Sequence, residues 1–211
     1  DIDWQTSHIL LKCALPVTIN SPRATFDIQF GNVERSTHRN TSWDWARFES
    51  AGQKWADLSE GNYGVALLND CKYGYDIHHD VIRLSLLKSA TMPDPEQDQG
   101  HHQMTYSLLP HEGDWRTDVP EQAYDLNMPA LAVRTTSGRG EQALHQLVGV
   151  SGFNVIVETI KAAEDGNGLI VRLYENERNR GPVKLRFGLP VARVEQTSIM
   201  EDEGKDVPVK Q

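Results

Sequence analysis

Short apolar segments separated by turn residues dominate the chain. In the segment ATFDIQFG, Phe26, Ile28 and Phe30 share one face and Asp27 and Gln29 the other, which is the two-residue period of a half-buried strand. Similar patterns bounded by turn residues predict further strands. The predicted strands are residues 8–17, 24–31, 63–70, 103–109, 145–152, 153–161, 168–176 and 183–196.

Two other elements complete the pattern. Residues 73–88 predict a hairpin, because strands flank His78 to Asp80 and alternate residues from Ile82 to Leu86 share a face. Residues 119–127 predict one helix, with Pro120 near its start. About ten strands at this spacing are typical of an antiparallel β-sandwich, so the sequence predicts an all-β fold with at most one or two short helices.

The segment from Thr37 to Glu49 is too aromatic for a solvated loop and too charged for a plain core strand. On a strand, Trp43 and Trp45 would share a face. Aromatic platforms bind sugar rings, but tryptophan also fills sandwich cores when its N–H finds a partner. Because buried tryptophan is common, residue types alone favour core or interdomain packing over ligand contact.

Composition narrows the class of protein. The 211 residues suit one large domain or two small ones, and the net charge of −9 without a Lys/Arg stripe argues against nucleic acid and anionic membrane as partners. No run of eighteen apolar residues predicts a transmembrane helix. Two cysteines, Cys13 and Cys71, give neither metal-site spacing nor a disulfide framework and suit a reducing compartment. The chain starts at Asp1 without Met and ends in a polar tail, so we expect both ends to be cuts.

Candidate chemistry in the chain is sparse. Adjacent strand residues point to opposite faces, so neither His78–His79 nor His101–His102 is expected to chelate a metal as a pair. The spacing of the acids does not select a glycosidase pair, and most are expected to be solvated. These acids are Asp70, Asp76, Asp94, Glu96 and Asp98. No nucleophile or phosphate-loop motif occurs, so we predict no catalytic and no metal-binding residues here.

A long loop, residues 89–102, carries Pro93, Pro95 and Gly100 between two predicted strands. Loops of this kind are often functional and otherwise mobile. The sequence leaves these two readings of the loop open.

Several segments together resemble the C-terminal β region of the α-mannosidases of glycoside hydrolase family 38. The resemblance is carried by FGNVERSTHRNTSWDWARFE, KWADLSEGNYGVALLNDCKYGYD, LSLLKSATMPDPEQDQGHHQMTYSLLPH and AEDGNGLIVRLYE, and it runs from about Asp3 to about Gln196. It implies a galactose-mutarotase-like supersandwich, forming a single domain over residues 1–211. Family members are longer, with an N-terminal α/β barrel that carries the catalytic Asp and zinc, then a helical bundle. They hydrolyse terminal α-linked mannose with retention.

The resemblance implies that this chain is an inactive fragment that supports the missing barrel and helical domain and completes the pocket for a mannose-containing glycan. It suggests Asp70 and Tyr73 near the active-site rim, and His102 in an H-x-F-x-Y strand where Met104 replaces Phe. Thr37–Glu49 would be an inner corner facing the missing domains. The similarity is closest to cytosolic and vacuolar enzymes, so we expect a cytoplasmic protein, with the vacuole as the alternative. The competing hypothesis is a non-catalytic carbohydrate-binding module.

Overall fold

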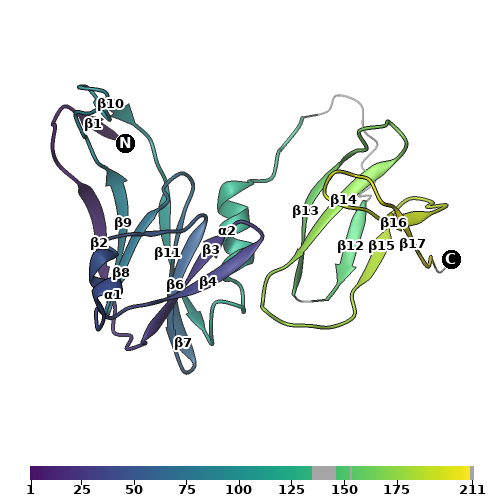
Figure 1. Ribbon diagram of the computed structural model, residues 1–211, viewed down its shortest axis with the longest axis horizontal. Helices are drawn as coiled ribbons and strands as arrows, with labels where there is room; N and C mark the ends of the chain where they lie inside the picture. Colours follow the sequence, from purple (N-terminus) through teal and green to yellow (C-terminus); the bar gives the residue numbers. More distant parts are fainter. Residues whose placement is uncertain (135–145, 153, 210–211) are drawn as a thin grey trace. The chain divides into compact units, whose positions relative to one another are not determined.

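The computed structural model describes residues 1–134, 146–152 and 154–209, which divide between two compact units, Asp1–Ala132 and Val133–Gln211. The described residues form antiparallel strands with two short helices, as Figure 1 shows, which confirms the predicted all-β class. A single domain over residues 1–211 stays a prediction, and each unit is described by itself. Neither helix in the described ranges is long and apolar enough to cross a membrane.

Two antiparallel sheets and one strand pair make up the first unit (Figure 1). A five-stranded sheet has the order β11-β7-β6-β3-β4, and a four-stranded sheet has the order β2-β9-β8-β5. The first sheet contains β3 (Arg23–Ile28), β4 (Gly31–Ser36), β6 (Trp55–Glu60), β7 (Tyr63–Asn69) and β11 (Tyr106–Glu112). The second contains β2 (Leu11–Pro16), β5 (Ser50–Ala51), β8 (Gly74–His78) and β9 (Val81–Leu87). β1 (Ile2–Trp4) pairs with β10 (Gly100–His102). The hairpin predicted over residues 73–88 is therefore confirmed as β8 and β9.

The main hydrophobic core lies between the two sheets, which makes the first unit a sandwich. Phe26 of β3 meets Tyr75 of β8 edge to face, with ring centroids 6.0 Å apart. Both rings are fully buried or nearly so. The buried side chains of this core are Ile19, Ala24, Phe26, Ala56, Leu58, Val65, Leu67, Tyr75, Ile77, Ile82 and Leu84.

A second core covers the opposite face of the five-stranded sheet. Trp55 of β6 stacks on Trp115 with ring centroids 5.3 Å apart, and Val119 and Ala123 of α2 (Val119–Asn127) pack there. α2 matches the helix predicted over residues 119–127, with Pro120 in its first turn. Because α2 covers this face, β7 is buried on both sides, which explains its uninterrupted apolar run.

An ion pair is buried in the same sheet. The ring of His111 on β11 extends across Gly64 of β7 and reaches Asp57 on β6, with Nε2 2.7 Å from Oδ1. Nδ1 lies 3.3 Å from the carbonyl oxygen of Glu112. Both partners only accept hydrogen bonds, so both ring nitrogens donate and the imidazole is a cation. Burial lowers the pKa of His111, but the hydrogen bond and charge of Asp57 outweigh it and raise this pKa.

The alternation predicted for residues 24–31 is only partly correct. Asp27, expected on the polar face, is 2% exposed and is paired with Lys54 at 3.1 Å. Burial raises the pKa of Asp27 despite the opposing effect of Lys54. Phe30 lies in the turn after β3 and is 60% exposed, because the strand ends at Ile28. A two-residue hydrophobic period does not predict a buried carboxylate whose charge is balanced by a lysine from another segment.

The segment Thr37–Glu49 is not a strand, and its place as an inner corner facing other domains stays a prediction. It contains α1 (Ser42–Ala46), whose capping box joins Thr41 and Asp44 and which has no buried residue. Trp43 and Trp45 are 82% and 61% exposed, so the core-packing hypothesis is wrong for both. Local capping, which competes with strand pairing, selects the helix.

Within its described residues, the second unit consists of strand pairs: β12 with β15, β13 with β14, and β16 with β17. Their bounds are β12 (Val148–Ser151), β13 (Val155–Ala162), β14 (Leu169–Glu175), β15 (Lys184–Phe187), β16 (Val194–Gln196) and β17 (Lys205–Val207). The segment predicted as one strand, residues 183–196, is two short strands. His145 and Phe153, which begin two predicted strands, lie outside the described residues.

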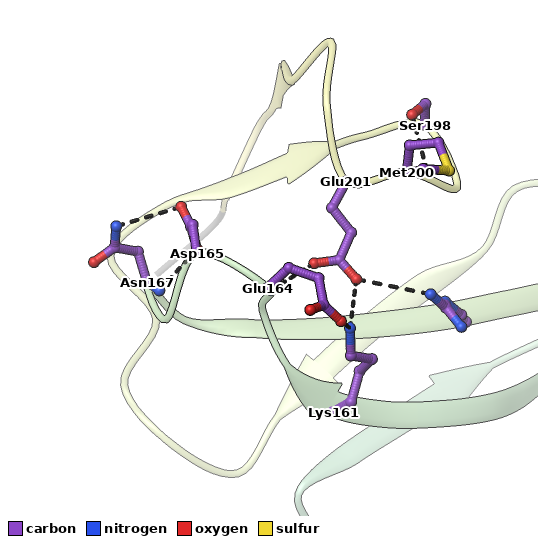
Figure 2. Close-up of polar contacts among 8 residues, drawn as sticks. Lys161, Glu164, Asp165, Asn167, Ser198, Met200 and Glu201 are labelled. Atoms are coloured by element: carbon purple, nitrogen blue, oxygen red, sulfur yellow. Dashed lines mark hydrogen bonds and ion pairs between the residues drawn. The ribbon is translucent and has the colours of Figure 1, made fainter.

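Glu201, between β16 and β17, ties that loop to the β13–β14 hairpin. Figure 2 shows its carboxylate accepting from Lys161 Nζ at 2.7 Å and from the backbone N–H of Glu164 at 2.8 Å. Arg172 of β14 lies 3.7 Å away. These contacts lower the pKa of Glu201, with the hydrogen bond from Lys161 as the largest cause. A polar anchor thus fixes this loop.

Gly64→Ala should lower the free energy of unfolding by about 1–3 kcal/mol, the usual cost of overpacking. A Cβ at this position would collide with the His111 ring and the Ser59 hydroxyl. Urea unfolding followed by the fluorescence of Trp55 and Trp115 measures the change. Gly181→Ala, where a Cβ meets nothing within 4 Å, is the control. Equal stability of the two variants would contradict the close contact.

The Asp57–His111 pair should make stability depend on pH. Because folding raises the pKa of His111 above its usual 6.5, the pair's contribution is fully present below that pH and is lost as pH rises through the folded-state pKa. His111→Gln should flatten the stability curve in the window that begins at pH 6.5 and extends upward to the folded-state pKa. The control is His101→Gln, since the His101 side chain is 66% exposed. Parallel curves for wild type and His111→Gln would refute the assignment.

Candidate functional site

The candidate site begins at the end of β7, where Asn69 fixes the following turn. Asn69 is 2% exposed, and its Oδ1 accepts from the backbone N–H groups of Cys71 (3.1 Å) and Lys72 (2.5 Å). Its Nδ2 donates to the hydroxyl of Tyr75 and to the carbonyl oxygen of Gln53. The Asn69 side chain therefore fixes the backbone of the turn, and its own position is fixed by the groups to which its Nδ2 donates.

Asp70 is exposed and lies on this turn. Its carboxylate oxygens lie 3.0 and 3.1 Å from the backbone N of Thr105, and its own N–H donates to the Thr105 carbonyl. Burial acts to raise the pKa of Asp70, but hydrogen bonds from Cys71 and Thr105 outweigh it and lower this pKa. Asp70 is thus an ionised acceptor that clips the turn to the segment before β11.

His102 lies on β10, where Ile2 of β1 is its strand partner. Its Nε2 lies 2.8 Å from the carbonyl oxygen of Asp98, so Nε2 carries a proton. The Asp98 carboxylate accepts from the backbone N–H groups of Lys88 (3.0 Å) and Ser89 (2.9 Å), and these bonds are the main reason for its lowered pKa. The predicted loop 89–102 is therefore held by internal contacts.

Tyr73 exposes 62% of its surface, and its backbone carbonyl accepts from the N–H of Gly52 at 3.0 Å. Its backbone is fixed while its ring stays exposed. Asp70 is clipped to Thr105, which follows His102 by three residues, so the turn that carries Asp70 and Tyr73 lies near the end of unit 1 that carries His102. Chemically, these side chains offer an ionised acceptor, an exposed aromatic ring and an imidazole.

The argument from opposite faces is wrong for His78 and His79. Their rings lie 4.2 Å apart between centroids, because His79 has left the strand with a φ of 52°. Within the described ranges, however, no group of three or more His, Cys, Asp or Glu side chains could hold a metal ion. The absence of a metal site in the whole chain stays a prediction.

Three functional features were missed at the sequence level. Asn69 falls within the predicted strand 63–70 with no role assigned to it, and Asp98 is one of the acids expected to be solvated. Asp76, read in the same way, has a 15% exposed side chain and faces Lys12, Arg39 and Arg83 within 4 Å. A turn-forming Asn at the end of a buried strand was the one available signal. The partners of Asp98 lie nine and ten residues away, and those of Asp76 come from other segments.

Two family descriptions match the sequence. Residues 1–96 match the "Glycosyl hydrolases family 38 C-terminal domain", and residues 154–211 match the "Glycosyl hydrolases family 38 C-terminal beta sandwich domain". Together these matches cover well over half of the chain.

Curated relatives give the same assignment. Alpha-mannosidase 2C1 of Mus musculus is 41% identical over 95% of this chain, and Alpha-mannosidase G of Dictyostelium discoideum is 40% identical over 97%. The chain spans only 20% and 19% of their lengths. A solved family 38 protein from Enterococcus faecalis superimposes with a TM-score of 0.73 at 20% identity, covering 90% of this chain and 24% of the other, which shows the shared fold. Two family 38 descriptions match this chain, and relatives about 40% identical to it cover nearly all of it. The chain therefore belongs to glycosyl hydrolase family 38 and corresponds to the C-terminal region of its members.

Proposed function

We propose that this chain is the C-terminal β region of a retaining, zinc-dependent α-mannosidase that hydrolyses terminal α-linked mannose. The observation that carries the proposal is the 41% identity with an α-mannosidase over 95% of the chain. Its partners are the N-terminal catalytic barrel and the helical domain of the same polypeptide, and a mannose-containing glycan is the substrate. The β region supports the barrel and contributes to the outer wall of the substrate pocket.

The zinc of the full-length enzyme lies outside the described residues in this proposal, since none of their side chains cluster as a metal site. No reaction step is assigned to this chain. Its role is to place Asp70, Tyr73 and His102 at the pocket rim, where a carboxylate and an aromatic ring can contact sugar hydroxyls and the apolar face of a sugar ring. The free thiols of Cys13 and Cys71 suit the reducing cytoplasm, with the vacuole as the alternative.

A carbohydrate-binding module remains the second candidate function, and the exposure of Trp43 and Trp45 favours it. Exposed tryptophan can stack on sugar rings. Calorimetry of the 211-residue chain with mannose oligosaccharides separates the two functions: millimolar or tighter binding that is lost in Trp43→Ala supports the module.

The isolated chain should not hydrolyse an aryl α-mannoside, with or without added zinc, whereas the longer polypeptide should. Chelation should abolish the activity of the longer polypeptide, and zinc should restore it. Turnover by the purified 211-residue chain that is lost on chelation and restored by zinc would refute the proposal that catalysis lies outside this chain.

In the full-length enzyme, Asp70→Ala should lower kcat/KM by roughly ten- to a hundredfold, or ~1.4–2.8 kcal/mol of transition-state stabilisation. Loss of the clip to Thr105 should also cost about 0.5–2 kcal/mol of stability, by analogy with helix caps. Thr105→Pro is the matched control, because it removes the N–H donor and keeps the carboxylate. If both variants are destabilised and both retain wild-type kcat/KM, Asp70 is a structural clip and leaves the list of site residues.

A further inference from the structure

An exposed patch on unit 1 combines aromatic and basic side chains. Trp43, Trp45 and Phe48 are 82%, 61% and 71% exposed, and exposed apolar patches that are rimmed by polar residues mark interaction sites. Arg47 lies within the same segment, and Arg35 of β4 lines a groove together with Arg47. We call these five residues the α1 surface.

The backbone that carries the aromatic residues is held in place by polar contacts. The N–H of Asp44 donates to the Thr41 hydroxyl at 3.1 Å, and the N–H of Thr41 donates to the Asp44 carboxylate at 3.2 Å. Ser36 of β4 donates to the same carboxylate at 2.7 Å. A five-residue helix is unstable alone, so these bonds are what maintain it while its aromatic side chains stay uncovered.

A groove of about 600 Å³ lies beside α1. Its lining residues are Pro22, Arg23, Glu34, Arg35, Ser36, His38, Asp44 and Arg47. Arg23 is paired with Glu34 at 3.1 Å, and Asp44 is engaged by Ser36 and Thr41. The nearest carboxylate oxygen to Arg47 is 3.8 Å away, beyond a good hydrogen bond.

Arg35 and Arg47 bring two positive charges together at this groove. One N–H of Arg35 donates to the Ala51 carbonyl at 2.6 Å, and its guanidinium lies over the Phe26 ring at 4.7 Å. Partial burial, together with the charge of Arg47, lowers the pKa of Arg35. An added carboxylate would relieve this repulsion and form charge-assisted hydrogen bonds.

We propose that the α1 surface docks the catalytic portion of the longer polypeptide, with one carboxylate of that portion entering the groove between Arg35 and Arg47. An apolar segment beside that carboxylate covers Trp43, Trp45 and Phe48. This inference rests on the proposed function. It names which face of the β region meets the rest of the enzyme and what chemistry that face recognises.

Two observations favour this occupant over a sugar. Neither Trp43 nor Trp45 lines the groove, so a sugar ring stacked on these tryptophans would not reach the polar groups of the groove. Tryptophan and arginine are among the residues most enriched in the energetically dominant positions of protein interfaces. Relatives about 40% identical to this chain are roughly five times its length, so most of their polypeptide is available as the partner.

Hydrogen exchange on the full-length enzyme and on the 211-residue chain tests the docking. Amides of residues 42–48 should exchange about tenfold or more slowly in the full-length enzyme, because docking closes an otherwise exposed segment. Trp43→Ala/Trp45→Ala and Arg47→Ala should each return that exchange toward the rate in the chain. Arg47→Lys should recover only part of the protection, since lysine lacks the bidentate fork. Met92→Ala, at an 81% exposed apolar residue outside the α1 surface, should change nothing there.

Four outcomes overturn the docking. Equal exchange rates of amides 42–48 in both proteins would show that the docking contact does not exist. Protection of these amides in the isolated 211-residue chain that increases with protein concentration would assign the α1 surface to a second copy of the chain. Mannose oligosaccharides that protect residues 42–48 of the chain would assign it to a sugar. If the variants unfold the chain itself, the aromatic residues serve unit 1 internally. A full-length protein that protects residues 42–48 but lacks mannosidase activity would refute the proposed function and leave the docking intact.

Discussion

The double-sided burial of β7 is the constraint on which unit 1 depends. Val65 and Leu67 pack into the core between the sheets, while Ala66 and Leu68 pack under α2. A strand that is apolar at consecutive positions cannot leave either face in water without losing about 25 cal/mol per Å² of apolar surface. It therefore requires a second sheet on one side and a helix on the other. The same strand places Asn69 at its end, so the candidate site is built on the most buried element of the unit.

Polar groups buried beside β7 add specificity to that burial. Asp57 and His111 are paired across it, and Asn69 is satisfied by backbone groups on both sides. A buried ion pair contributes little net stability, but losing one partner costs several kcal/mol. Strand registers other than the observed one would leave these groups unpaired. Gly64 fits this arrangement, since only a glycine lets the His111 ring pass across the strand.

Much of the sandwich could be predicted from the sequence, because its elements are set by local pattern. The run Val65–Leu68, the hairpin over residues 73–88 and the helix over residues 119–127 all carry signals within a few residues. The hydrophobic pattern gave wrong predictions where a polar partner elsewhere in the chain determines whether a side chain is buried or anchored. Asp27 is buried because Lys54 neutralises it, and Asp98 is anchored by backbone groups ten residues away. At α1, a capping box outweighed the β-propensity of two tryptophans. The exposure of these side chains cannot be inferred from residue type when other parts of a longer polypeptide can pack against them.

The two units rely on different physical contributions. Unit 1 has two hydrophobic cores, whereas the buried residues within the described part of unit 2 are Gly149, Asn154 and Asn176. Two-stranded ribbons are marginal on their own. The positions of their loops therefore depend on directional contacts, of which the Glu201 anchor is the clearest. Lys161 and the Glu164 N–H donate to its carboxylate (Figure 2). Arg172 lies 3.7 Å from the same carboxylate. Such contacts fix geometry more than they add free energy, because exposed ion pairs are screened by salt. The loop held in this way keeps a defined shape although its apolar side chains Ile199 and Met200 are exposed, so polar contacts and not apolar burial set its geometry.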